Sequence, residues 1–116
     1  MGLCDFAHEP KEEMGMDFTP LFETANAIVA DGKGILAADE SSPTIKKRFD
    51  GIGVESNEAN RQVYRSMLFT TSGVADFVSG VILFDETIRQ QSVDGRSMVE
   101  VLRNGGMIPG IKVDKG

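Results

Sequence analysis

The chain has 116 residues, which is enough for one domain, or part of one, with a hydrophobic core and leaves little room for a second. Its formal net charge of -6 at pH 7 argues against nonspecific binding to nucleic acid as the main activity. One cysteine excludes an internal disulfide, and no apolar run approaches the roughly 20 residues of a membrane span. A cytoplasmic, water-soluble protein is expected, without metal-ligand spacing of Cys and His.

Residues 1–18 form an acidic, turn-rich segment that we expect to be a flexible leader, followed by one domain over residues 19–116. The opening MGLCDF is similar to a myristoylation signal, but Phe6 stands where Ser or Thr is required. The single histidine, His8, lies in this leader and is interpreted as a tail residue rather than a ligand or base.

The first regular element is a helix that begins with Thr19 as cap and Pro20 in the first turn and ends before Gly32. Its apolar residues recur at helical spacing: Leu21, Phe22, Ala25, Ile28 and Val29. A short apolar run over residues 35–38 predicts a strand, and Ser42 and Pro43 then open a second helix that reaches Phe49.

A third helix is predicted from a cap at Ser56 or Asn57, and its apolar face is interpreted as core packing: Val63, Tyr64, Met67 and Leu68. Residues 81–84 predict a strand buried on both faces. After the turn at residues 94–95, Ser97 is expected to cap a short helix. A last strand follows, with Pro109 near its beginning because proline in mid-sheet would remove a hydrogen-bond donor.

This order of helices and strands predicts an α/β fold whose parallel strands are joined by crossover helices. Polar residues follow each apolar strand: Asp39 and Glu40, then Asp85 and Glu86, then Lys112 and Asp114. The carboxyl ends of parallel strands are where α/β sheets and barrels bind ligands. The candidate site therefore lies at this edge.

Two phosphate motifs are excluded. The run GKGILA has its glycines before the strand, whereas a dinucleotide fingerprint needs them between strand and helix, and no P-loop motif occurs. A helix N-terminus offers another route, because Ser41, Ser42 and Thr44 surround free amides, and Arg48 shares a helix face with Thr44. The alternative is that Ser42 merely caps the helix while residues 46–48 form a solvated basic face.

Three further side chains have two interpretations each. Asp39 is either a turn residue or a general acid or base beside the phosphate-like site. Lys112 and Asp114 alternate onto the same strand face, where they form a simple ion pair or present an amine to an anionic substrate.

Five segments in this order, GKGILAADES, TIKKRF, ANRQVYR, VSGVILFDET and GIKVDKG, resemble class I fructose-bisphosphate aldolases. The resemblance extends over residues 19–116 and matches roughly the first third of that family's chain. It implies a (β/α)8 TIM barrel, usually a homotetramer, of which this chain supplies an N-terminal helix and about the first three strands. The implied reaction is glycolytic cleavage of fructose 1,6-bisphosphate to dihydroxyacetone phosphate and glyceraldehyde 3-phosphate.

In this family a lysine forms an imine with the substrate ketone, and no metal or other cofactor is needed. By resemblance, Asp39 is the catalytic aspartate of the first strand, and Lys112 is a lysine that contacts substrate. Ser41, Thr44 and Arg48 match the region that binds the 6-phosphate end. Pro43 departs from the common Thr-Gly pattern, which suggests a pre-organised turn or an altered phosphate affinity.

The imine-forming lysine of the family lies beyond the last residue of this sequence. The 116-residue chain is therefore expected to be inactive alone, and the alternative hypothesis is a noncatalytic aldolase fragment or interaction module. The partner implied by the resemblance is a sugar bisphosphate, with no nucleic acid and no membrane. A different barrel enzyme that binds sugar phosphates is a third hypothesis.

Overall fold

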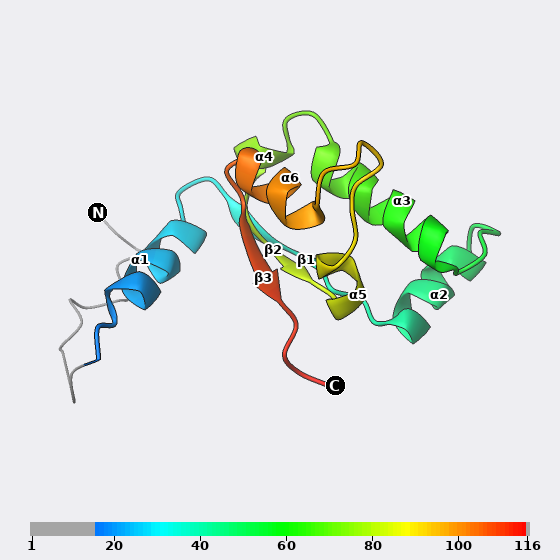
Figure 1. The fold of residues 1–116 in the computed structure, drawn as a ribbon, viewed down its shortest axis with the longest axis horizontal. Helices are drawn as coiled ribbons and strands as arrows, with labels where there is room; N and C mark the ends of the chain where they lie inside the picture. Colours follow the sequence, from blue (N-terminus) through cyan, green and yellow to red (C-terminus); the bar gives the residue numbers. More distant parts are fainter. Residues whose placement is uncertain (1–15, 116) are drawn as a thin grey trace.

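The computed structural model describes residues 16–115, so most of the expected leader, with Cys4 and His8, lies outside the described residues. One parallel sheet has the strand order β1-β2-β3, with β1 (Gly34–Ala38), β2 (Val78–Leu83) and β3 (Ile108–Ile111). The helices are α1 (Thr19–Ile28), α2 (Ser42–Asp50), α3 (Glu58–Thr70), α4 (Val74–Phe77), α5 (Asp85–Ile88) and α6 (Met98–Asn104). The predicted parallel α/β alternation is confirmed (Figure 1).

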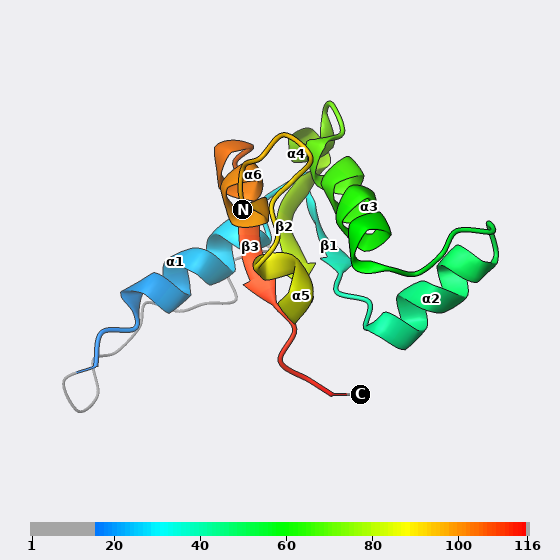
Figure 2. The same ribbon diagram turned by 45° about the vertical axis from the view of Figure 1, so that its right-hand side comes forward.

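Helices α3 and α6 cover one face of the sheet, and the hydrophobic core lies between them and the strands (Figures 1 and 2). The buried core consists of Ala38, Phe69, Val81, Leu83, Met98, Val101, Leu102 and Met107. Alternation along β2 directs Val81 and Leu83 to this side and leaves Ile82 on the opposite face. The opposite face is more open, since Ile35 of β1 is exposed.

The side of helix α3 that faces the core coincides only in part with its apolar pattern. Val63 and Met67 are more than half exposed, and the fully buried residues are Arg65, Ser66 and Phe69. The prediction is confirmed for Leu68, which packs against the core, and Tyr64 packs on the ring of Phe49. It was wrong for Val63 and Met67, because it assumed that only apolar residues are buried, whereas Arg65 and Ser66 enter the interior with polar partners. Asn57 is the cap, as one of the two predicted candidates, and accepts a hydrogen bond from the Asn60 amide.

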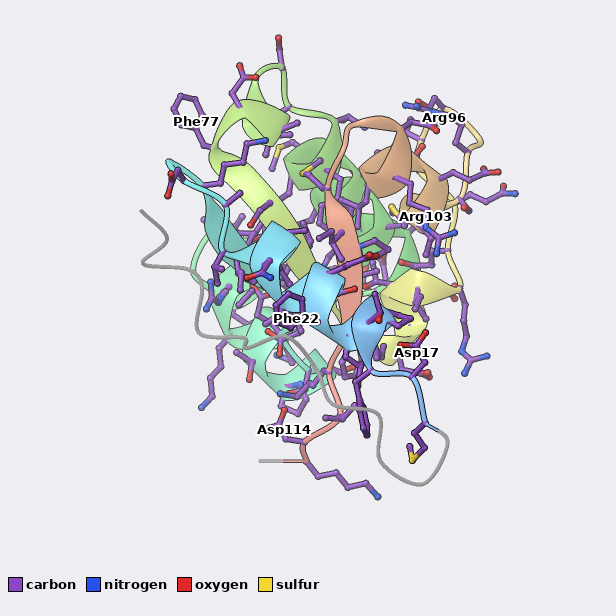
Figure 3. All side chains as sticks on the ribbon, turned by 90° about the vertical axis from the view of Figure 1, so that its left-hand side faces the viewer. Asp17, Phe22, Phe77, Arg96, Arg103 and Asp114 are labelled. Carbon is purple, nitrogen blue, oxygen red and sulfur yellow. The ribbon has the colours of Figure 1, made fainter. Side chains whose placement is uncertain are left out.

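Helix α1 crosses in front of the strands in Figure 3, and its last residue contacts β2 on the face away from the core. Thr19 is its first residue rather than its cap, and the Thr19 amide donates to the Asp17 carboxylate. The helix ends at Ile28, whose side chain lies over β2 at Gly80. A Cβ atom at position 80 would come within 2.9 Å of Ile28 Cγ1, so this contact requires glycine.

Two short helices were not predicted, because four residues are too few to give a helical pattern. Helix α4 directly precedes β2, and its Phe77 is 71% exposed and points away from the body of the molecule (Figure 3). Helix α5 begins at Asp85, so the two acids that follow β2 lie in a helical turn. Ser97 caps α6 as predicted, in a capping box with Glu100.

An ion pair ties α3 to α5. Arg61 donates from Nε and Nη2 to the two carboxylate oxygens of Glu86, at 2.7 and 2.9 Å. These hydrogen bonds hold the pKa of Glu86 below its usual range and raise that of Arg61. No helix in the described part of the chain is long and apolar enough to cross a membrane.

The first prediction concerns the contact between α1 and the sheet. Gly80→Ala should lower the free energy of unfolding by about 1–3 kcal/mol, because Ile28 must shift to admit the methyl group. Urea denaturation measures the change, and adding Ile28→Ala should remove most of the penalty. Gly34→Ala is the matched strand control, since a Cβ there meets nothing within 4 Å. Equal losses at positions 34 and 80 would contradict this account.

The second prediction concerns the pair of Arg61 and Glu86. Because the folded pKa of Glu86 lies below its ordinary value of 4.5, the pair stabilises the fold above that pH and loses its effect as pH falls through the folded pKa. Glu86→Gln should cost about 1 kcal/mol at pH 7, and the difference should shrink towards pH 3. The measurement is urea denaturation across this range. Asp50→Asn, which breaks the exposed pair with Lys46, should change little at either pH.

Candidate functional site

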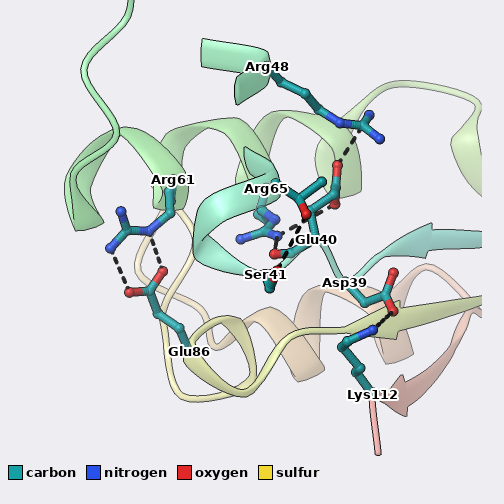
Figure 4. A network of polar contacts seen from close by, with 9 residues as sticks. Asp39, Glu40, Ser41, Arg48, Arg61, Arg65, Glu86 and Lys112 are labelled. Atoms are coloured by element: carbon teal, nitrogen blue, oxygen red, sulfur yellow. Dashed lines mark hydrogen bonds and ion pairs between the residues drawn. The ribbon is translucent and has the colours of Figure 1, made fainter. Parts of the chain in front are cut away.

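Side chains from the first and third strands meet at the carboxyl end of the sheet. Asp39 follows β1 directly, and Lys112 follows β3, where its amide still donates to Leu83 of β2. Lys112 Nζ lies 3.4 Å from the Asp39 carboxylate and 2.9 Å from that of Asp114 (Figure 4). Lys112 therefore forms the predicted ion pair with Asp114 and also reaches the candidate catalytic acid.

The two carboxylates favour the charged form of Lys112. The hydrogen bond to Asp114 is the main cause that raises the pKa of Lys112, and the bond to Asp39 adds to it, while desolvation acts against both. The amine therefore stays protonated at neutral pH. A protonated amine attracts anions and is a poor nucleophile, so this arrangement suits binding of an anionic group.

A hollow of about 480 Å³ lies beside this pair. Three of the predicted site residues, Ser41, Thr44 and Lys112, line it. The remaining lining residues are Phe84, Asp85, Val113, Asp114 and Lys115. Strand ends and the turn between β1 and α2 thus enclose one space that is lined by two hydroxyl groups, two lysines and two aspartates.

The turn between β1 and α2 positions the two hydroxyl groups. Ser41, not Ser42, occupies the cap position of α2, and its side chain makes no capping hydrogen bond. Its hydroxyl instead lies 3.4 Å from that of Thr44. Pro43 falls in the first helical turn, where its missing N–H leaves no helix hydrogen bond unmade. The helix N-terminus therefore keeps amides available for an anion.

Arg48 lies apart from the hollow. Its Nη1 atom lies 3.4 Å from Glu40 Oε2, and its side chain is 61% exposed. Arg48 and Thr44 share α2, but the carboxylate of Glu40 draws the guanidinium to the other side of the turn (Figure 4). Lys46, in contrast, forms an exposed pair with Asp50, as expected for part of a solvated face.

A buried pair behind the turn was not predicted. Arg65 of α3 is fully buried, and its Nη2 atom donates to the backbone oxygen of Glu40 at 2.8 Å. The same atom lies 3.5 Å from Glu40 Oε1. The available signal was the spacing of Arg65 three and four residues before the apolar Leu68 and Phe69, which puts the three residues on one side of the helix.

The geometry supports recognition of an anion beside a carboxylate. Lys112, Ser41 and Thr44 supply a cation and two hydroxyl groups, and Asp39 supplies a group that accepts or donates a proton. Within residues 16–115 there is no group of three or more His, Cys, Asp or Glu side chains that could hold a metal ion.

Known proteins with similar sequences are aldolases. The family model described as fructose-bisphosphate aldolase class-I matches residues 20–116. Fructose-bisphosphate aldolase 1 of Toxoplasma gondii is 62% identical over 83% of this chain and 26% of its own length. The cytosolic fructose-bisphosphate aldolase 7 of Arabidopsis thaliana is 57% identical over 83% of this chain and 27% of its own.

A solved structure agrees with these relatives. Fructose-bisphosphate aldolase from Plasmodium falciparum, in a ternary complex with TRAP and a small molecule inhibitor, superposes with a TM-score of 0.78 at 56% identity. The match covers 81% of this chain and 27% of that one. The chain therefore spans between a quarter and a third of the length of the relatives it matches. Since the family model covers residues 20–116, this chain belongs to the class I fructose-bisphosphate aldolase family.

Proposed function

We propose that this chain is the N-terminal part of an enzyme that cleaves fructose 1,6-bisphosphate to dihydroxyacetone phosphate and glyceraldehyde 3-phosphate. The observation that carries the proposal is the contact between Asp39 and Lys112 at a hollow lined by Ser41 and Thr44. A sugar bisphosphate needs both an anion site and a group that moves protons at its hydroxyls, and this edge of the sheet supplies both.

Each site residue receives a role consistent with its contacts. Ser41 and Thr44 bind the 6-phosphate with the N-terminus of α2, and Lys112 adds a positive charge. Asp39, between β1 and the turn, contacts the reacting lysine and the substrate hydroxyls. Arg48 reaches the phosphate by leaving Glu40, since its long exposed side chain is free to change rotamer.

The imine forms on a lysine outside this chain. Its protonated nitrogen withdraws the electron pair of the breaking carbon–carbon bond, and the remaining strands supply the other phosphate site. The three strands described above are then the first three of a (β/α)8 barrel, and the open face with Ile35 becomes part of its interior. A homotetramer in the cytoplasm is proposed for the whole protein, in keeping with the cytosolic Arabidopsis relative.

A second candidate applies to the 116-residue chain by itself, namely a noncatalytic aldolase fragment or interaction module. The observation that favours it is the extent of the match, since this chain covers only 26% of the length of the Toxoplasma relative and the imine is proposed to form on a lysine outside it. For the chain alone this candidate is preferred, whereas aldol cleavage is proposed for a complete subunit.

The third prediction tests Asp39 in a complete subunit, built by placing residues 20–116 in the Toxoplasma relative in place of the matching segment. Asp39→Ala should lower kcat by about 10²- to 10⁴-fold, the usual contribution of a positioned acid or base, and change KM much less. Steady-state kinetics provide the measurement. Asp50→Ala, an exposed acid on α2, serves as control and should leave both constants unchanged. Equal kcat for the Asp39 variant and its parent would refute the role.

The fourth prediction separates the two candidates. Fructose 1,6-bisphosphate and borohydride should trap a covalent adduct on the complete subunit and none on the purified 116-residue chain, since the imine is proposed to form on a lysine outside it. Mass spectrometry of the intact proteins detects the added mass. An adduct on the 116-residue chain would rule out the noncatalytic candidate, and its absence from the complete subunit would refute aldol cleavage by this mechanism.

A further inference from the structure

We propose that Arg65 is a positioning residue for phosphate binding, which it supports by fixing the peptide group between Glu40 and Ser41. The inference rests on the proposed function, since it assumes that Ser41 and Thr44 bind the 6-phosphate. Arg65 does not line the hollow, so its effect is transmitted through the turn between β1 and α2.

The geometry of the contact identifies what Arg65 holds. Its Nη2 atom donates to the Glu40 backbone oxygen at 2.8 Å, and that oxygen belongs to the same peptide group as the Ser41 amide. Because a peptide group is planar and rigid, fixing its oxygen also fixes the direction in which the chain enters α2. The bond spans 25 residues and joins the middle of α3 to the phosphate-binding turn (Figure 4).

The guanidinium of Arg65 also pairs with the side chain of Glu40. Its side chain is 0% exposed, and the Glu40 carboxylate, itself 9% exposed, lies 3.5 Å away. Within residues 16–115, Arg65 Nε and Nη1 make no hydrogen bond. A buried guanidinium is costly unless it is paired, so Glu40 supplies both the nearby counter-charge and the hydrogen-bond acceptor. The turn is thereby held through both the backbone and the side chain of one residue.

The two contacts of Arg65 with Glu40, called here the Arg65 clamp, act only on the side of the site that carries the hydroxyl groups of Ser41 and Thr44. Ser41 is the cap residue of α2 and moves with the held peptide group. Asp39 is also fixed from β3, where Lys112 contacts its carboxylate. Loosening the clamp should therefore weaken phosphate binding and leave the proton-transfer group in place, which separates this role from a general loss of stability.

The test compares two substrates on the complete subunit, because only one of them carries the 6-phosphate. Arg65→Lys keeps a buried positive charge and removes the planar fork that reaches the Glu40 oxygen. We expect its KM for fructose 1,6-bisphosphate to rise about tenfold, with KM for fructose 1-phosphate and both kcat values within twofold of the parent.

The matched control is Arg61→Lys, one helical turn away on α3, whose guanidinium pairs with Glu86 rather than the turn. It should leave KM for both substrates within twofold. A purely structural role for Arg65 would raise KM equally for both substrates, and this result, or no change with either, would overturn the proposal.

A second measurement does not depend on catalysis, so it tests the role of Arg65 separately from the proposed reaction. Hydrogen exchange of residues 41–50, measured by mass spectrometry, reports the concentration of inorganic phosphate that protects the turn. We expect half-protection to require about tenfold more phosphate in Arg65→Lys than in the parent or in Arg61→Lys. Equal concentrations would overturn the clamp, while an inactive parent that still shows the shift would overturn only the proposed reaction.

Discussion

Parallel pairing of three strands in one register determines where the polar groups of the site lie. Ala38 of β1 pairs with Leu83 of β2, which pairs with Ile111 of β3, so the next residues along the outer strands, Asp39 and Lys112, lie at the same height. Side chains alternate along a strand, and a shift of one residue in either pairing would direct one of these two groups to the helices. The contact between the carboxylate and the ammonium group follows from this register.

The turn that carries the hydroxyl groups depends on a different part of the fold. Its support comes from α3, where Arg65 contacts Glu40 from inside the protein. The sheet thus positions the pair of Asp39 and Lys112. Helix α3, which packs on the sheet, positions the N-terminus of α2 beside that pair. Both supports belong to regular secondary structure, and the proposed recognition of a phosphate next to a reacting carbon requires the two halves of the site to keep a fixed separation.

The sequence predicted the strands and the longer helices well, since these depend on local patterns: apolar runs, caps such as Asn57 and Ser97, and glycines at turns. It also predicted that Ser41, Thr44 and Lys112 would gather at one edge. It could not place Arg48, because helix periodicity gives the face of a residue and not the competing partner, here Glu40. It missed Arg65 for the same reason, since burial of a charge depends on a contact 25 residues away.

The acidic balance of the chain also acts at the site. Lys112 contacts two carboxylates, so under the proposed function a phosphate competes with Asp39 and Asp114 for the same amine. These acids weaken the attraction for the phosphate, but they hold the amine in place before the ligand arrives and so reduce the entropy lost on binding. Arg48 is likewise paired with a carboxylate, that of Glu40. Cations that are already paired make binding depend on the geometry of the phosphate as well as its charge, and this geometry is what the turn between β1 and α2 defines.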